Sequence, residues 1–323
     1  MNRQNQILAG VLVLQIVLAA VMFWPRPAAS VASGEKLFPG LEASHITRLK
    51  IKDVAGTQIE LAKGAAGWGL AGADDFPAQE SVVTPFLDKL AGLKADRMVT
   101  RTGSSHKRLK VAISDFERMI TIETDDGKSV KFYLGSSPSY QVAHVRPEDR
   151  NEVYLVSGLS AADASVQAAG WIDSLYLSLD QNQVTALTVQ NKSGLFEFAK
   201  DEAGAWTMQG LAEDETLDDS RITTLLSRLA TLRMSRPLGK NEQDAYGMKE
   251  PAAIVTVQTR DSAGAAKSYT LRVGARDEVD STYTAISSES EYYVRVASYS
   301  VQDFVEQGHD YFLKLPPTPT PAQ

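Results

Sequence analysis

The side chains best suited to metal binding or acid–base chemistry are four histidines scattered along the chain: His45, His106, His144 and His309. A dedicated zinc site places its ligands at short, regular spacings, and no two of these histidines are spaced in that way. No H-E-x-x-H sequence and no carboxylate–histidine cluster accompanies them. The sequence therefore predicts no metal site and no cofactor, and it identifies no catalytic residue.

Two short basic sequences offer further hypotheses. His144 and Arg146 are two positions apart and would share one face of a predicted strand, where they could hold an anion; the alternative is a solvated sheet face. The sequence His106–Arg108, with Lys110, is the one basic cluster in an acidic chain. It could contact lipid headgroups or an acidic partner, and the alternative is a solvated loop.

Acidic residues precede each of two predicted helices, at Asp74–Asp75 and at Glu213–Glu215 followed by Asp218–Asp219. A calcium loop needs alternating oxygen ligands, a central glycine and a closing glutamate, and neither run has this pattern. Negative charge near a helix N-terminus complements the exposed N–H groups and the helix dipole. We therefore interpret both runs as structural.

Glycine and tryptophan residues mark one more region of possible ligand binding. Gly64–Gly69 is rich in glycine, but it joins two predicted strands and lacks the following helix of a dinucleotide site, so we expect a hairpin loop. Trp68 and Trp206 could form a sugar-stacking platform, although an aromatic residue repeated at one place in both halves favours a core position. Because no G-x-S-x-G element is present, nothing indicates an enzyme.

The elements that would position these residues are repeated within the chain. Ile46–Ile51 resembles Val184–Val189, 138 positions later, and Trp206 follows Trp68 by the same shift. The stretch Ser81–Lys94 resembles a second stretch that begins at Ser220. A period this long indicates a duplicated domain, since solenoid repeats run about 20–50 residues. Scaffolds and binding surfaces are duplicated more often than catalytic sites.

The hydrophobic pattern predicts the same elements in each half. Alternating residues predict strands and hairpins, with Asp-Gly turns such as Asp125–Gly127 between them. Apolar residues at helical spacing predict one amphipathic helix at 81–94 and another at 220–233. The predicted fold class is α+β, with two tandem duplicated domains, each a mainly antiparallel sheet with one principal amphipathic helix, preceded by a single transmembrane helix. The predicted divisions are an anchor at 1–27, a linker at 28–44, repeats at 45–180 and 181–313, and a Pro/Thr-rich tail at 314–323.

Composition bounds the compartment and the partners. The 323 residues include no cysteine, which excludes disulfides and cysteine nucleophiles, and the net charge of −7 makes nucleic acid an improbable partner. The uncharged stretch Ile7–Trp24 would span about 27 Å as a helix, close to the roughly 30 Å hydrocarbon core. We predict a retained single-pass anchor with the N-terminus inside and the body outside the cytoplasmic membrane. The alternative is a signal peptide cleaved after Ser30–Ala32.

Several of these motifs together resemble the bacterial family of domains of unknown function 4340 (DUF4340). The matching stretches are Leu109–Val111 through Phe116–Arg118, Tyr133–Pro138, His144–Arg146, Glu152–Val156, Trp171–Asp173, and Tyr246–Met248 followed by Pro251. These are packing and turn signatures, so the resemblance implies no active residues. Family members are often encoded beside gliding-motility-type ABC transporters, which implies an accessory envelope component.

Two functions remain open at this point. The first is a membrane-anchored, non-catalytic accessory or scaffold subunit on the outer side of the cytoplasmic membrane, with a transporter permease or auxiliary subunit as partner. The alternative is an exterior protein that binds a glycan or another ligand in the cleft between the two repeats.

Overall fold

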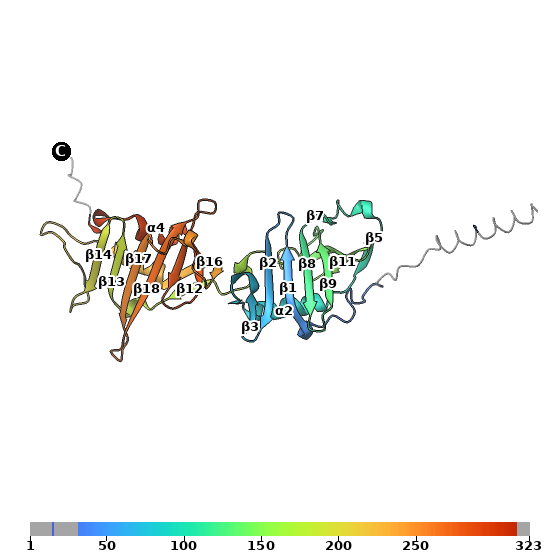
Figure 1. Cartoon of the computed structure of the whole chain (residues 1–323), viewed down its shortest axis with the longest axis horizontal. Helices are drawn as coiled ribbons and strands as arrows, with labels where there is room; N and C mark the ends of the chain where they lie inside the picture. The colour runs from blue at the N-terminus through green and yellow to red at the C-terminus, as the bar shows by residue number, and fades with distance from the viewer. Residues whose placement is uncertain (1–14, 16–31, 315–323) are drawn as a thin grey trace, which may run out of the picture.

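The computed structural model describes residue 15 and residues 32–314, which form two lobes side by side along the long axis of the molecule (Figure 1). The first lobe contains β1 (Ile46–Lys52), β2 (Gln58–Gly64), β3 (Gly67–Leu70), β4 (Phe76–Pro77), α2 (Glu80–Ala91), β5 (Arg97–Thr100), β6 (Val111–Ala112), β7 (Asp115–Phe116), β8 (Arg118–Thr124), β9 (Ser129–Leu134), β10 (Val142–Pro147) and β11 (Val153–Ser157). The second contains β12 (Leu175–Ser178), β13 (Val184–Asn191), β14 (Gly194–Lys200), β15 (Trp206–Met208), α3 (Asp219–Ala230), β16 (Thr231–Gly239), β17 (Ala253–Arg260), β18 (Ala266–Arg276), β19 (Thr282–Ser287), β20 (Tyr293–Ala297) and α4 (Ser298–Glu306).

Each lobe is built on a nine-stranded antiparallel sheet, and the two sheets share one strand order. The first has the order β4-β3-β2-β1-β8-β9-β10-β11-β5. The second, from its corresponding edge, has the order β15-β14-β13-β17-β18-β19-β20-β16-β12. Strand β4 and strand β12 are the extra strands, one at either edge. This shared order is what a duplicated domain produces.

Period-two alternation places one face of each sheet in the core. Leu49 and Ile51 of β1, and Leu187 and Val189 of β13, are fully buried, whereas Lys50 between the first two is half-buried. Successive side chains of a strand point to opposite faces, so every second residue meets the helix layer. One face of α2 and one face of α3 supply the other side of this core: Val83, Phe86, Leu87 and Leu90, and Ile222, Leu225, Leu226 and Leu229.

The helices end three residues earlier than the predicted ranges. Leu93 and Leu232 are buried as the pattern requires, but both lie beyond the ends of their helices, and Leu232 is already in β16. The carbonyl of Leu93 accepts a hydrogen bond from the N–H of Leu37 at 2.8 Å, and Leu232 pairs with Leu177 of β12. The second lobe also has α4, for which the sequence predicted no helix.

The N-terminal segment is part of the first lobe. The N–H of Gly34 donates to the carbonyl of Ala95 at 2.7 Å, and Leu37, Phe38 and Leu41 are buried. These residues lie in the predicted linker at 28–44. Their backbone pairs with residues 93–95, as β12 pairs with the start of β16 in the second lobe.

The predicted transmembrane helix is corrected. The part of the chain that the structure describes contains no helix long and apolar enough to cross a membrane. The stretch Ile7–Trp24 lies outside the described residues except for Gln15, and the described residues form two lobes, each built on an antiparallel sheet. The predicted tail at 314–323 also lies outside them, apart from Lys314.

Candidate functional site

The loop after β5 folds back onto the face of the first sheet away from α2, where it forms a second, smaller core. Leu109 accepts a hydrogen bond from the N–H of Ser136 at 3.0 Å, and Lys110 adopts a left-handed conformation with φ 57°. Val111, which is fully buried, accepts from Nε of Arg146 at 2.8 Å. We call Leu109–Val111 with Arg146 the first clamp, because the arginine fastens the loop to the sheet.

Arg146 uses its hydrogen-bond donors in this structural role. Its side chain is 4% exposed, and its Nη1 donates to the carbonyls of Pro147 at 3.3 Å and Arg150 at 3.2 Å. The guanidinium lies 4.4 Å from the ring centroid of Tyr133, and burial lowers the pKa of Arg146. Because its donors face backbone carbonyls, Arg146 is neither on a solvated sheet face nor available to hold an anion.

The buried histidines hold neighbouring loops in the same way. Nδ1 of His144 lies 2.8 Å from the carbonyl oxygen of Ser136 and 3.1 Å from its hydroxyl. Nε2 of His106 lies 2.8 Å from the carbonyl oxygen of Asn151. Both rings are 9% exposed, so His106 does not belong to the surface of the basic cluster, and Lys110 pairs with Asp115 at 2.8 Å.

The other two histidines lie apart from the first two and from each other. His45 contacts Asp125 at 3.1 Å, and His309 contacts Glu215 at 2.9 Å. The hydrogen bonds from the N–H of Ala212 and from His309 lower the pKa of Glu215. Within the described residues no three acidic or histidine side chains gather in a metal-binding group.

The second lobe repeats the clamp with different residues. Tyr246–Gly247–Met248 takes the place of Leu109–Val111, and Gly247 has the left-handed φ of 68°. Arg272 of β18 donates to the carbonyl of Met248. Tyr246, Met248 and Tyr293 form the corresponding small core, with the two tyrosine rings 5.3 Å apart. We call Tyr246–Met248 with Arg272 the second clamp.

A glycine in each sheet permits the clamp loop to lie against it. A Cβ atom on Gly135 would lie 2.2 Å from the carbonyl oxygen of Leu109, and one on Gly274 would lie 2.0 Å from that of Tyr246. Neither glycine has a positive φ, so close approach of the backbone is what excludes a side chain. The sequence motif containing Tyr246 and Gly247 is therefore a packing element, as the family resemblance implied.

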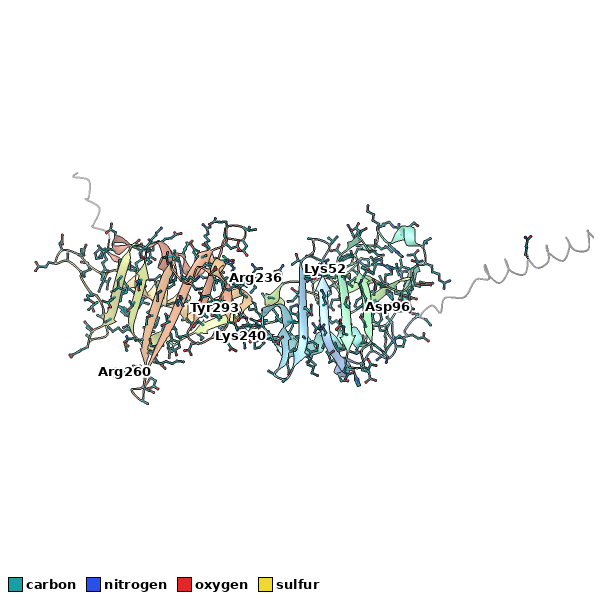
Figure 2. The ribbon with its side chains drawn as sticks, in the orientation of Figure 1. Lys52, Asp96, Arg236, Lys240, Arg260 and Tyr293 are labelled. Carbon is teal, nitrogen blue, oxygen red and sulfur yellow. The ribbon has the colours of Figure 1, made fainter. Side chains whose placement is uncertain are left out.

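The junction between the lobes is built on Asp74, which the sequence analysis had assigned to a helix N-terminus. Asp74 and Asp75 both have left-handed backbone conformations, with φ of 51° and 57°. Oδ2 of Asp74 accepts from the N–H of Lys240 at 2.7 Å, and the ring of Phe76 meets that of Tyr292 at 4.8 Å. Figure 2 shows Lys240 on the side of the second lobe that faces the first.

The second acidic run does cap its helix. Oδ1 of Asp218 accepts from the N–H of Ser220 at 3.0 Å at the start of α3, and the hydroxyl of Ser220 holds the pKa of Asp218 below its usual value. Trp68 is 6% exposed and lies in the core. Trp206 is only half-buried, with Nζ of Lys200 5.3 Å above its ring. Gly64 and Gly67 bound the turn between β2 and β3, which is the predicted hairpin.

A cavity of about 530 Å³ opens where the two lobes meet. Its lining combines polar side chains with a small apolar floor: Arg48, Thr57, Gln58, Glu60 and Gln167 from the first lobe, Arg236 and Pro237 from the second, and Leu70, Ala71, Ala73 and Val166 beneath them. Arg48 is paired with Glu60 and lies 3.3 Å from Glu123, and Arg236 lies 3.6 Å from Asp280, so both cations already have acidic partners. A cleft between the repeats was one of the two expectations from the sequence, but its lining residues could not be named because they come from distant segments.

Comparisons with known proteins agree with the motifs. A family model described as a domain of unknown function (DUF4340) matches residues 68–251, which is more than half of the chain. The match begins in β3 and ends just after the loop of the second clamp, so it includes both clamp loops. No curated protein and no solved structure gives a match.

Proposed function

The chain belongs to the DUF4340 family, and from that premise we propose that it is a non-catalytic accessory subunit on the outer side of the cytoplasmic membrane. It works by docking onto an integral-membrane partner, a transporter permease or its auxiliary subunit. The family resemblance implies the transporter partner, and docking onto that partner accounts for the place of the chain at the membrane.

One observation carries the non-catalytic part of this proposal. The side chains that were candidates for chemistry, His106, His144 and Arg146, hydrogen bond to backbone or neighbouring side chains that fix loops. Arg272 has the corresponding use in the second lobe. In both lobes, therefore, buried polar side chains hold loops in place. This use supports a scaffold function, in which the outer surface is the part available to partners.

The proposal is tested by cross-linking in cells. A photo-reactive residue at Val54, Tyr140, Val279 or Tyr299, all of which are well exposed, would sample four separate surfaces of the full-length chain. We expect one of these positions to cross-link strongly to a transporter subunit, and gentle-detergent purification to recover that subunit in near-stoichiometric amount. Cross-links spread evenly over all four positions, with the chain purifying alone, would contradict the proposal.

The cavity between the lobes favours a second candidate function, the binding of an exterior glycan or another polar ligand. It has about 530 Å³, and Thr57, Gln58 and Gln167 place hydroxyl and amide groups around it. Gly72 lines it too, and a Cβ there meets nothing within 4 Å, so Gly72→Leu is a suitable substitution for narrowing the cavity. Chitohexaose is a suitable probe: binding by the parent chain that is lost in Gly72→Leu would favour this candidate, and equal binding by both would contradict it.

A further inference from the structure

The contact between the lobes is asymmetric, because each lobe uses a different surface. The first lobe contributes the turn from Ala71 to Asp74, and the second contributes the strand edge from Arg236 to Lys240. A Cβ atom on Gly239 would lie 2.6 Å from Oδ2 of Asp74, so the turn presses directly onto this edge. A contact of this kind is heterologous: it leaves one turn and one edge unused.

The unused edge is β5 of the first lobe, and its pairing matches that of Arg236–Gly239 residue by residue. Arg97 pairs with Leu155 of β11, and Arg236 pairs with Arg295 of β20, the equivalent strand. Thr100 in the same way takes the place of Gly239. Both edges have a bulge at this point, between the second pair and the last. The two edges are therefore structurally equivalent.

The β5 edge differs from its counterpart mainly in being uncovered. Met98 and Val99 are each 37% exposed, whereas Pro237, at the position of Met98, is buried and lines the cavity at the junction. Arg97 and Arg101 are exposed, and among the described residues neither takes part in an ion pair. The β5 edge is thus apolar in its middle, with an exposed arginine at each end and Asp96 directly before the first of them.

The unused turn is that of the second lobe, after β15. Its residues Gly210, Ala212, Glu213 and Asp214 are exposed, and two of them are acidic. At the 138-residue shift of the tryptophans, Ala212 stands where the first lobe has Asp74. Ala212 has no carboxylate, so docking of this turn would lack the hydrogen bond that Asp74 makes with Lys240 and would depend on charge and on the apolar middle of the edge.

The two unused surfaces lie at opposite ends of the molecule. In Figure 1, β5 lies at the outer end of the first lobe, and β14 lies at the far end of the second lobe. Asp96, which precedes β5, is labelled at the outer side of the first lobe in Figure 2. A second copy whose turn after β15 docks on the β5 edge would therefore continue the molecule along its long axis.

We propose that the chain associates head to tail with a second copy, the Gly210–Asp214 turn of one docking on the β5 edge of the other. The acidic turn and the basic edge have complementary charge, and the contact would cover Met98 and Val99. The proposal does not depend on the transporter partner. Because the contact is heterologous and does not close on itself, association should continue past the dimer as concentration rises.

Cysteine cross-linking tests the contact directly, because the full chain has no cysteine of its own. Arg101→Cys protein mixed with Asp214→Cys protein should form a mixed disulfide under mild oxidation. The matched control is Val54→Cys mixed with Asp214→Cys, since Val54 is 59% exposed but lies in the β1–β2 turn. A mixed disulfide no faster than in this control would overturn the proposal.

Charge exchange provides a second measurement in solution. Sedimentation velocity of the full chain should show concentration-dependent association, and Arg97→Glu with Arg101→Glu should weaken it by about tenfold or more. Mixing that variant with Glu213→Arg/Asp214→Arg protein should restore association, because every mixed pair then joins surfaces of opposite charge. A chain that stays monomeric at every concentration, or a mixture that fails to recover, would overturn the proposal.

Discussion

In both clamps an arginine binds a carbonyl of the clamp loop, but the arginine comes from a different strand in each lobe. In the first lobe Arg146 of β10 binds the carbonyl of Val111, and in the second Arg272 of β18 binds the carbonyl of Met248. Strand β18 corresponds to β9, the neighbour of β10, so the arginine has changed strands between the lobes.

The partner position has changed with it. Arg146 is directly opposite Tyr133 of β9, and Arg272 is directly opposite Ile286 of β19. Each clamp therefore has one arginine and one apolar or aromatic side chain on a cross-strand pair, in exchanged order. What is retained between the lobes is an arginine on one cross-strand pair rather than an arginine at one position in an alignment.

The largest effect should come from the glycines beneath the clamps. Gly135→Ala and Gly274→Ala each place a Cβ atom against a backbone carbonyl, at 2.2 Å and 2.0 Å, so we expect a loss of about 4 kcal/mol or more in the free energy of unfolding. Urea denaturation measures it, with Gly72→Ala as control because its Cβ meets nothing within 4 Å. A large loss in only one of the two would break the equivalence of the clamps.

Moving the arginine of the first clamp from β10 to β9 should have the next largest effect. Arg146→Ile leaves buried carbonyls without a donor and should cost about 2–4 kcal/mol of unfolding free energy. Adding Tyr133→Arg reproduces the second lobe's arrangement and should recover about 1 kcal/mol or more, because the new guanidinium starts from the opposite position. Additive losses in the double variant would show that the two arrangements are not interchangeable.

Substitutions of Asp74 at the junction between the lobes should have a smaller effect on stability. Asp74→Ala removes the acceptor of the Lys240 N–H, whereas Asp74→Asn retains an oxygen and tolerates the left-handed backbone. We expect the alanine variant to lose about 1 kcal/mol and to expose the chain between the lobes to limited proteolysis. Equal proteolysis of the two variants would argue against the role given to this hydrogen bond.

Each lobe also has an ion pair between its helix, α2 or α3, and the segment that follows β11 or β20. The contribution of the first of these ion pairs to stability should depend on pH. Lys89 contacts Asp163 at 2.7 Å, as Arg228 contacts Asp303 at 2.7 Å. Burial alone would raise the pKa of Asp163, but hydrogen bonds from Lys89 and Ser160 outweigh it and leave the pKa below its usual 3.8.

The sign of the pH effect follows from that lowered pKa. The stabilisation is fully present above pH 3.8 and is lost as pH falls through the lower folded-state pKa. Asp163→Asn should therefore be less stable than the parent chain by about 1 kcal/mol at pH 7, with the gap closing in acid below 3.8. The free energy of unfolding of both chains, measured at pH 7 and at a pH below 3.8, tests this expectation. A difference between the two chains that is the same at both pH values would contradict it.

The smallest effect concerns helix capping. Asp218 caps α3 with its side chain, whereas Gln79 at the start of α2 makes no such hydrogen bond. Gln79→Asp should raise the unfolding free energy by about 0.5–1 kcal/mol, and Gln79→Ala, which adds no acceptor, should not. Thermal unfolding of the three chains measures it, and no gain from aspartate would mean that the α2 terminus differs in more than its cap.

Local patterns predicted the elements because those patterns act over a few residues. The hairpin turn at Asp125–Gly127 and the helices near 81–94 and 220–233 could be placed from spacing alone. The clamps could not, since the Arg146 side chain meets a carbonyl 35 residues away in sequence. The left-handed Lys110 also gave no signal, because only its equivalence to Gly247 reveals it.

The functional surfaces were missed for the same physical reason. Asp74 lies 166 residues from its hydrogen-bond partner Lys240, so its acidic run was interpreted as a local helix feature. His144 and Arg146 were placed correctly on one strand, but burial depends on the loop that covers them. A comparison of Leu109–Val111 with Tyr246–Met248 was the one sequence signal that could have pointed to the clamps.

The way in which Leu37 completes the first lobe has a consequence for synthesis of the chain. The edge beside Leu93 is supplied by residues that precede the first hairpin, and the edge beside Leu232 by residues that follow Trp171. Each lobe is thus assembled from one uninterrupted stretch and borrows no strand from the other. The first lobe can close once about residue 172 has left the ribosome, before any of the second sheet exists, so domain-by-domain folding keeps two similar sheets from exchanging strands.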